Sequence, residues 1–230
     1  MNCLKDTKMK NDITICIPVR GGSRRIPRKN LLTLGGESLL ARKIRQTLPL
    51  GRVVVGSDDA EMLQEAERCG AETIRRKCTN EGRDSANDMI AEFMRLIPPC
   101  ETILWAHCTN PFISTATYAD ALACYYLARE EGYDSLFSVR ELRGHFWDSK
   151  GEPLYDLDRC RERHICANDL DPIYEQDGGI FIQSYAQMRK NHYFFGSRPL
   201  MYTIEEAEYC DINTPLDWEI CQWRFEHEAH

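Results

Sequence analysis

Short apolar segments rich in β-branched residues alternate along this chain with segments whose apolar residues recur at helical spacing. The predicted buried strands lie at residues 12–19, 52–57, 102–106 and 135–139. The predicted helices lie at residues 36–48, which Ser38 can cap, in the segment that begins with Asp58 and Asp59, and at residues 88–96 and 117–130. Strands that alternate with helices form a parallel sheet covered by helices on both faces. The sequence therefore predicts a three-layer α/β fold with a mostly parallel, Rossmann-like sheet.

The alternating pattern breaks between residues of about 140 and 176, where the sequence becomes polar and irregular. We expect an inserted arm there, of the kind that often mediates dimerisation. Strand character returns at residues 179–183, and residues 199–204 are a candidate for one more strand. With 230 residues, 43% of them hydrophobic, the chain can bury a core as one domain over residues 1–230. The expected assembly is a homodimer.

The sequence contains no apolar run long enough to cross a membrane, and its first ten residues lack the apolar stretch of a secretory signal. Its eleven cysteines are odd in number and form no Cys-x-x-Cys pair. This pattern favours reduced thiols over a disulfide framework or a zinc site. We therefore expect a cytoplasmic protein that has no contact with a membrane.

The net charge of −7 disfavours a surface that binds nucleic acid. Positive charge is nevertheless concentrated after the first strand, in five residues that fall within ten positions: Arg20, Arg24, Arg25, Arg28 and Lys29. Gly21 and Gly22 lie in the same loop, and glycines let backbone N–H groups approach phosphate oxygens whose charge Arg and Lys neutralise. A basic loop can also be only a solvated surface. Walker and Gly-x-Gly-x-x-Gly motifs are absent, which disfavours P-loop hydrolysis and dinucleotide binding.

The loop resembles a known family. Its sequence from Ile17 to Asn30, Ile-Pro-Val-Arg-Gly-Gly-Ser-Arg-Arg-Ile-Pro-Arg-Lys-Asn, is similar to the signature of the acylneuraminate cytidylyltransferases, or CMP-sialic acid synthetases. That family usually has Pro-Ala-Arg-Gly-Gly-Ser-Lys-Gly-Ile-Pro-x-Lys-Asn here. Residues 53–59 and 84–87 are also similar to family segments. Residues 177–181 resemble its Asn-Gly-Ala-Ile-Tyr, and residues 210–217 its Ile-Asp-Ile-Asp-Thr-x-x-Asp.

The resemblance implies a nucleotide-diphospho-sugar transferase fold and a nucleotidyltransferase reaction. In this reaction the anomeric hydroxyl of an acidic 2-keto-3-deoxy sugar, similar to sialic acid, attacks the α-phosphate of CTP. The products are CMP-sugar and pyrophosphate, and Mg²⁺ is the implied cofactor. Because the transition state spreads negative charge over phosphate oxygens, positioned cations supply much of the catalysis.

The same resemblance implies roles for individual residues. The implied catalytic residues, which would contact phosphate, are Arg20 and Lys29. The implied nucleotide-binding residues are Val19, Arg20, Gly21, Gly22, Ser23, Arg24, Lys29, Asn30, Lys77, Asp84 and Ser85, although the spacing leaves Arg76 open in place of Lys77. The implied residues on the sugar side are His107, Asn110, Gln176, Phe194 and Phe195. The implied metal ligands are Asp211 and Asn213.

Four residues of the chain depart from the family pattern in ways that matter for substrate and mechanism. Asn213 replaces one aspartate of a carboxylate pair, which should weaken metal binding before substrate phosphates arrive. His107 replaces a glutamine, Ile113 an arginine and Arg25 a glycine, so we expect a different sugar and a locally different loop. If that glycine has positive φ, Arg25 would be strained.

Several interpretations therefore remain open. A histidine after a buried strand is more often a structural hydrogen-bonding residue than a base, and an Asn-Pro pair is often only a turn. The aromatic pair Phe194 and Phe195 can equally belong to a core or an interface. At the level of function, the alternatives are a nucleotidyltransferase for another sugar or base, and a catalytically weak nucleotide-sugar-binding protein of the same fold.

Overall fold

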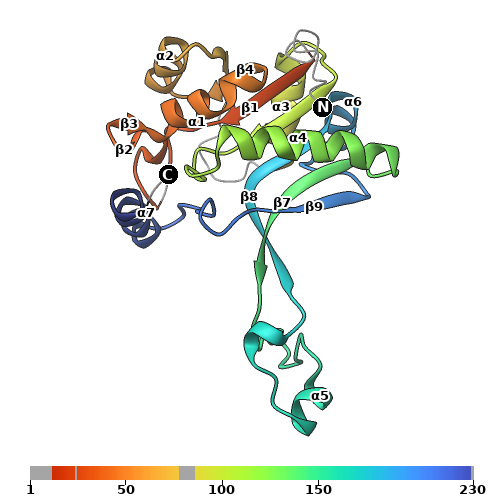
Figure 1. Ribbon diagram of the computed structural model, residues 1–230. Coiled ribbons are helices and arrows are strands. Elements are labelled where there is room, and N and C mark those ends of the chain that lie inside the picture. The colour runs from red at the N-terminus through yellow and green to blue at the C-terminus, as the bar shows by residue number, and fades with distance from the viewer. Residues whose placement is uncertain (1–11, 24, 78–85, 229–230) are drawn as a thin grey trace, which may run out of the picture.

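A computed structural model of the chain describes residues 12–23, 25–77 and 86–228. Its centre is a seven-stranded sheet with the strand order β5-β4-β1-β6-β8-β7-β9 (Figure 1). These strands are β1 (Ile13–Pro18), β4 (Arg52–Ser57), β5 (Glu72–Arg75), β6 (Thr102–Ala106), β7 (Ser135–Leu142), β8 (Ile173–Ser184) and β9 (Pro199–Thr203). Strand β8 is antiparallel to both of its neighbours, and the other pairs are parallel. The expectation of a mostly parallel sheet is confirmed.

Helices cover both faces of the sheet. Helices α1 (Leu39–Thr47), α2 (Ala60–Arg68) and α4 (Thr115–Glu130) pack on one face, where they meet the side chains of Ile13, Ile15 and Ile17. Helices α3 (Ala86–Leu96) and α6 (Tyr185–Asn191) pack on the other. Successive residues of a strand point to opposite faces, so β1 contributes Ile13, Ile15 and Ile17 to one core and Cys16 to the other. The three layers predicted from the sequence are present.

Side-chain caps explain where the helices begin. The hydroxyl of Ser38 accepts a hydrogen bond from the N–H of Ala41 at 3.0 Å, which is the cap expected for α1. Asp59 caps α2 by accepting from Glu61 and Met62. The C-terminal helix α7 (Pro215–His227) was not predicted, and it begins with a capping box between Thr214 and Asp217.

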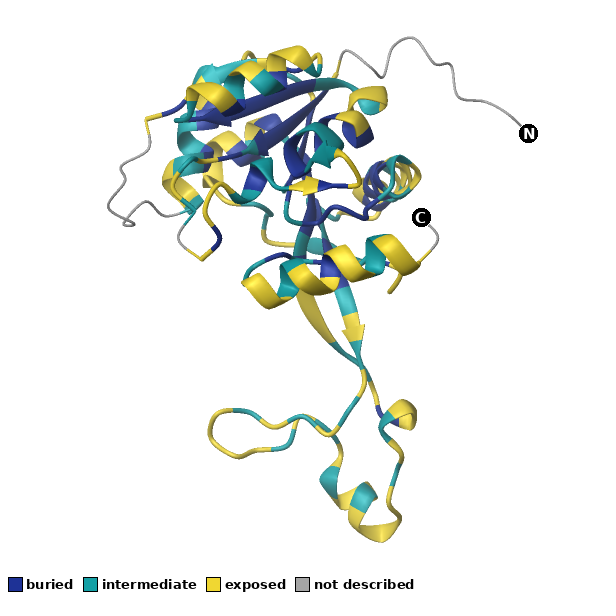
Figure 2. Cartoon of the chain, turned by 90° about the vertical axis from the view of Figure 1, so that its left-hand side faces the viewer, coloured by how far each residue is buried: buried dark blue, intermediate teal, exposed yellow. Residues whose placement is uncertain are grey.

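The inserted segment forms a long arm that extends away from the body (Figure 1). It differs from the irregular segment that we expected, because β7 and β8 continue into it as a two-stranded ladder that pairs Arg140 with Glu175 and Leu142 with Ile173. Beyond the ladder lie α5 (Leu157–Glu162) and a 3-10 turn (Ala167–Asp169). Figure 2 shows that the far part of the arm is mostly exposed.

Several short elements complete the chain. The hairpin β2 (Thr33–Leu34) and β3 (Glu37–Ser38) precedes α1, and 3-10 turns lie at Lys29–Leu31 and Leu48–Leu50. Within the described residues, no helix has the length and apolar character needed to cross a membrane. The nine cysteines of these residues are free, and Cys3 and Cys78 lie outside them.

The hairpin yields a test of packing against backbone strain. Gly35 and Gly36 both have positive φ, at 62° and 82°, as a two-residue hairpin turn requires. A Cβ on Gly35 would lie 2.2 Å from Cζ of Phe225, whereas one on Gly36 would have no atom within 4 Å. We expect Gly36→Ala to lower the free energy of unfolding by about 1 kcal/mol, from backbone strain alone.

For Gly35→Ala we expect a loss of about 3 kcal/mol, because the ring of Phe225 on α7 must also move. Urea unfolding of both variants measures the difference. Equal losses would contradict the packing of α7 against this hairpin.

Candidate active site

Three loops meet at one edge of the sheet because β1 pairs in parallel with both β4 and β6. Parallel strands bring their carboxyl ends to the same edge, and ligands of open α/β sheets bind there. The loops that follow Pro18, Ser57 and Ala106 are therefore neighbours. The N–H of Val19 donates to the carbonyl of Gly56 at 3.0 Å, so the first loop leaves β1 still attached to β4.

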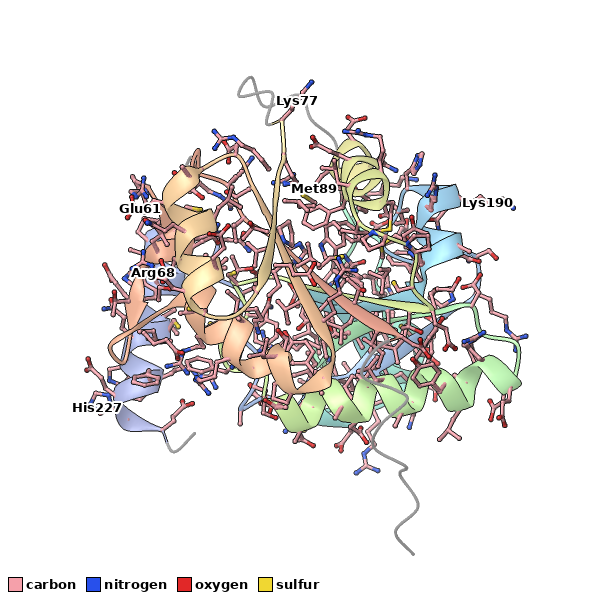
Figure 3. The ribbon with its side chains drawn as sticks, turned by 90° about the horizontal axis from the view of Figure 1, so that it is seen from above. Glu61, Arg68, Lys77, Met89, Lys190 and His227 are labelled. Carbon is pink, nitrogen blue, oxygen red and sulfur yellow. The ribbon has the colours of Figure 1, made fainter. Side chains whose placement is uncertain are left out.

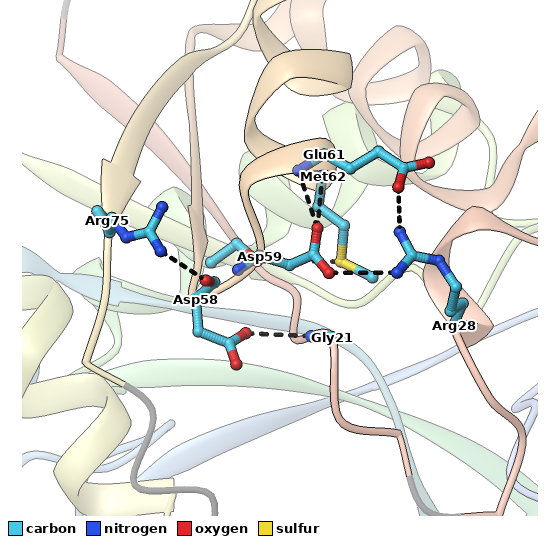
Figure 4. A network of polar contacts seen from close by, with 8 residues as sticks. Gly21, Arg28, Asp58, Asp59, Glu61, Met62 and Arg75 are labelled. Atoms are coloured by element: carbon cyan, nitrogen blue, oxygen red, sulfur yellow. Dashed lines mark hydrogen bonds and ion pairs between the residues drawn. The ribbon is translucent and has the colours of Figure 1, made fainter.

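The first loop is held on one side by carboxylates (Figure 4). The N–H of Gly21 donates to Asp58 Oδ1 at 3.1 Å. A Cβ on Gly21 would lie 2.8 Å from Asp59 Oδ2, so a larger residue at this position would force the Asp59 side chain to shift. Arg28 forms ion pairs with Asp59 at 3.4 Å and with Glu61 at 2.7 Å.

The backbone of the loop differs from our expectation. We considered that Arg25 would be strained if it had to adopt positive φ. Among the described residues other than glycine, positive φ occurs at Arg28 and His192, with φ of 52° and 50°. Arg25 therefore avoids that strain, and Arg28 carries it beside its two carboxylate partners.

On its other side the loop contacts residues 211–213, near the C-terminus. Lys29 Nζ donates to the carbonyl of Ile212 at 2.6 Å. Arg25 Nη2 donates to Asn213 Oδ1 at 2.9 Å. Burial lowers the pKa of Lys29, the charge of Asp211 opposes that shift, and the charges of Arg25 and Arg20 add to it. These charged groups therefore share one electrostatic environment, which contains more cations than carboxylates.

The segment that follows β9 places the predicted metal ligands side by side. The amide nitrogen of Asn213 donates to Asp211 Oδ2, and the N–H of Asn213 donates to Asp217 Oδ2 at 2.9 Å. Both ends of the Asn213 amide are thus engaged, since its oxygen accepts from Arg25. Asp211 is partly exposed beside the basic loop of residues 19–30.

The backbone carbonyls of three successive residues of β8, 177–179, accept hydrogen bonds from side chains of the site. His107 Nδ1 donates to Gly178 O at 2.7 Å, because its Nε2 accepts from the indole N–H of Trp105 at 3.2 Å. Asn110 Nδ2 donates to Asp177 O at 3.1 Å, and the Tyr118 hydroxyl donates to Gly179 O at 3.4 Å. His107 is therefore a structural hydrogen-bonding residue, as the alternative interpretation of a histidine after a buried strand stated. Asn110 also makes a structural hydrogen bond, to a distant strand. Their contact with a sugar stays a prediction.

Aromatic rings form the wall beside His107. Phe194 stacks on Phe181 with ring centroids 4.5 Å apart and meets His107 edge-on at 6.0 Å. Phe195 stacks on Phe137 at 4.8 Å, farther along the sheet. Gln176 is exposed in the ladder at the base of the arm.

Comparison with known proteins identifies the family to which this site belongs. A family model described as "Cytidylyltransferase" matches residues 14–153. The chain belongs to the cytidylyltransferase family. It is a nucleotidyltransferase, and the resemblance noted in its phosphate loop is confirmed.

Known relatives match nearly the whole length of this chain. An N-acylneuraminate cytidylyltransferase of Oncorhynchus mykiss is 28% identical over 96% of this chain, which spans about half (52%) of that longer relative. A CMP-N,N'-diacetyllegionaminic acid synthase of Legionella pneumophila is 26% identical over 91% of this chain and 94% of its own. A pseudaminic acid cytidylyltransferase of Campylobacter jejuni is 25% identical over 96% and 99%.

Solved structures show the same fold. A CMP:2-keto-3-deoxy-manno-octonic acid synthetase complexed with CTP has a TM-score of 0.68 at 16% identity, covering 95% of this chain and 100% of its own. A 4-diphosphocytidyl-2C-methyl-D-erythritol synthase of Anaerococcus prevotii also has a TM-score of 0.68, at 11% identity, covering 94% and 97%. The expected nucleotide-diphospho-sugar transferase fold is confirmed.

The remaining predicted nucleotide ligands of this cytidylyltransferase fall into two groups. Arg24, Asp84 and Ser85 lie outside the described residues. Val19 and Asn30 are buried, whereas Gly22 and Ser23 lie on the loop with at least part of their surface accessible.

The structure distinguishes Arg76 from Lys77, which the sequence could not. Arg76 is buried beneath the loop, where its guanidinium donates to Val19 O at 3.1 Å and lies over the ring of Phe93. Lys77 is exposed, and Figure 3 shows its side chain pointing away from the body. Arg76 therefore contacts the loop and Lys77 does not point toward it, and nucleotide binding by Lys77 or Arg76 stays a prediction.

Sequence reasoning missed Lys43, a fully buried residue behind the site. Its Nζ donates to Asn110 O at 2.8 Å and to the Tyr118 hydroxyl at 2.7 Å, both neutral groups. Burial lowers its pKa to about 7. Its spacing from Leu39 and Leu40 on the buried stripe of α1 is the pattern that could have identified it.

The metal site can be tested against its donor atoms. Within the described residues, no three His, Cys, Asp or Glu side chains gather as a metal-binding group. Mg²⁺ in nucleotide enzymes usually keeps waters and is held by one or two carboxylates together with phosphate oxygens. Asp211 fits one such ligand. The amide oxygen of Asn213 already accepts a hydrogen bond from the positively charged Arg25, which disfavours a second cation at the same oxygen.

The buried imidazole of His107 makes stability depend on pH. Burial lowers the pKa of His107, although the hydrogen bond to Gly178 and the charge of Asp211 oppose that shift. As pH falls below about 6.5, unfolded His107 takes up a proton that the folded state refuses, so stability is lost in that direction. Between pH 7.5 and 5.5, we expect the free energy of unfolding to decrease by about 1 kcal/mol less in the His107→Gln variant than in wild type.

Urea unfolding at both pH values measures the effect as a difference between wild type and variant, which removes the contribution of other titrating groups. His227→Gln, which changes an exposed histidine at the end of α7, is the matched control. A loss of stability that is unchanged in His107→Gln would show that this imidazole is not held neutral.

Proposed function

We propose that the protein joins CTP to an acidic 2-keto-3-deoxy sugar of the nonulosonate type, giving CMP-sugar and pyrophosphate. The observation that carries this proposal is the convergence of Lys29 and Arg25 on residues 211–213, where both donate hydrogen bonds to neutral oxygens. Two relatives that match this chain over nearly their whole length are named for legionaminic acid and pseudaminic acid, and these names support a sugar of the nonulosonate type.

The proposed reaction uses positioning and charge. The anomeric oxygen bonds to the α-phosphorus as the bond from the α-phosphorus to the bridging oxygen of pyrophosphate breaks. The hydroxyl proton passes to water, and negative charge develops on the phosphate oxygens. Lys29 and Arg20 would bind those oxygens, and Gly21 and Gly22 would let the backbone approach them. Mg²⁺ is part of the proposal: when bound, it neutralises phosphate charge. Asp211 would hold it, together with Asn213 if Arg25 leaves the amide.

On the sugar side, we propose that Phe194 and His107 form one wall of the pocket. His107 is neutral and donates its proton to a backbone carbonyl, so it presents a flat ring instead of a base. Asn110 shapes this wall from behind, while Gln176 and Phe195 would contact substrate nearer the arm. We further propose that the protein works in the cytoplasm, where its free cysteines stay reduced.

Pyrophosphate release with CTP, UTP, GTP and ATP, across sialate, legionaminate, pseudaminate and 3-deoxy-manno-octulosonate, tests this function. We expect turnover with CTP and at least one nonulosonate. Lys29→Met should lower kcat about 100-fold, because a charge aimed at the phosphates is lost. The control Lys190→Met removes an exposed lysine on α6 (Figure 3) and should leave kcat unchanged.

The result also separates the alternatives. Turnover with another base or sugar would favour a nucleotidyltransferase of different specificity. Binding of CTP without pyrophosphate release from any pair would favour a catalytically weak binding protein.

We also propose that two copies associate through the arm. Between Arg143 and Leu170 the arm has no buried side chain before Leu170 itself, and Trp147 and Leu154 are each 51% exposed. An extended segment without its own core gains stability by packing on a partner. CTP and the acidic sugar would then be the small-molecule partners, with no nucleic acid and no membrane.

Light scattering during gel filtration tests the dimer. We expect wild type to elute as a dimer and Trp147→Glu/Leu154→Glu to shift to the monomer mass. The variant Trp223→Glu changes a tryptophan that is 57% exposed on α7 and should stay dimeric. A monomeric wild type, or a double variant that remains dimeric, would contradict the proposed interface.

A further inference from the structure

Two positions that depart from the family pattern contact each other. Arg25 stands where the resemblance implies glycine, and Asn213 stands where it implies aspartate. These residues lie 188 positions apart in the chain, yet Arg25 Nη2 donates to Asn213 Oδ1 at 2.9 Å. The two departures therefore belong to one local change in the site.

Both departures change the charge of the site in the same direction. Arginine in place of glycine adds one positive charge, and asparagine in place of aspartate removes one negative charge. Together they shift the site by two positive charges, which equals the charge of one divalent cation. With aspartate at position 213, Arg25 would instead form an ion pair and be less available to another anion.

The contact geometry leaves Arg25 able to reach a phosphate. Its side chain is exposed, and its direct hydrogen-bond partner is the neutral amide oxygen of Asn213, with the carboxylate of Asp217 close enough to interact through its charge. An exposed contact of this kind contributes little stability, whereas a guanidinium bound to phosphate makes stronger, charge-assisted hydrogen bonds. Lys29 is fixed beside it on Ile212 O, so the two cations flank residues 211–213.

We infer that Arg25 supplies charge that a cation held by a second carboxylate would otherwise supply, so that the protein binds CTP without first binding a divalent cation. In the absence of CTP, Arg25 donates to the neutral amide of Asn213, and when CTP binds it exchanges this contact for the triphosphate. This inference rests on the proposed function, because it concerns how CTP is held. The Mg²⁺ of the proposed function would then arrive together with the phosphates of CTP, with Asp211 as its protein ligand.

Calorimetric titration of CTP into the full chain, in EDTA and in excess Mg²⁺, tests the inference. We expect wild type to bind in both buffers, with dissociation constants within about threefold. Arg25→Ala should weaken binding in EDTA at least about tenfold and have a smaller effect in Mg²⁺. The control Arg68→Ala removes an exposed arginine on α2 and should change neither value.

A reverse substitution gives a readout that does not involve nucleotide. The variant Arg25→Gly/Asn213→Asp restores the family residues, and we expect it to bind Mn²⁺ alone at least about tenfold more tightly than wild type, measured by electron paramagnetic resonance. Its binding of CTP should become dependent on Mg²⁺. Asn213→Asp alone should also weaken binding of CTP in EDTA, because it ties Arg25 to a carboxylate.

The contrary results are distinct. Wild type that binds CTP only with Mg²⁺, or Arg25→Ala that matches wild type in EDTA while remaining folded by circular dichroism, would overturn the inference and leave the proposed function standing. Folded wild type that binds CTP in neither buffer would overturn the proposed function as well.

Discussion

The parallel pairing of β1 with β4 on one side and β6 on the other determines where chemistry can occur in this protein. Because these strands run in the same direction, the loops after Pro18, Ser57 and Ala106 emerge at one edge. Strand order also places antiparallel β8 next to β6, so its residues 177–179 enter the same edge from the opposite direction. The site is therefore assembled from segments whose proximity follows from the sheet and not from the chain order.

The basic loop of residues 19–30 is fixed on two sides by different kinds of contact. On one side, Asp58 and Asp59 bind the N–H of Gly21 and the side chain of Arg28. On the other side, Lys29 and Arg25 bind residues 211–213, and their direct partners there are neutral oxygens. Cations held by neutral acceptors keep most of their attraction for an anion. The arrangement is thus complementary to a ligand with several negative charges.

The sequence predicted best those elements whose pattern is strong and local. The bounds expected for β4 and β6 agree with the structure, and Ser38 caps α1 as its hydroxyl and position indicated. Strand β5 was missed because its four residues lie at the sheet edge and carry exposed charges. Helix α7 was missed because Leu216, Ile220 and Trp223 place apolar side chains on its exposed face, which obscures the helical pattern.

The residues of the site can also be separated into those that a local sequence pattern predicted and those that it did not. The loop from Val19 to Asn30 is one continuous segment, so its role could be proposed from residue types and their order. The partners of His107 could not, because Gly178 lies 71 residues away and only β8 brings it near. Lys43 escaped notice for a different reason: its charge suggested solvent, whereas its position on the buried stripe of α1 determined its environment.

This division bears on how substrate specificity can change in the family. On the proposed nucleotide side, the loop offers backbone groups and a few cations, and the contact between Arg25 and Asn213 shows a cation matched to its partner at residues 211–213. On the proposed sugar side, Phe194 and the neutral ring of His107 form a wall whose shape is set by hydrogen bonds behind it. Under the proposed function, substitutions in that wall would alter which sugar fits without disturbing the charges beside residues 211–213. Discrimination between sugars can therefore evolve at the wall and the arm while the nucleotide end stays the same.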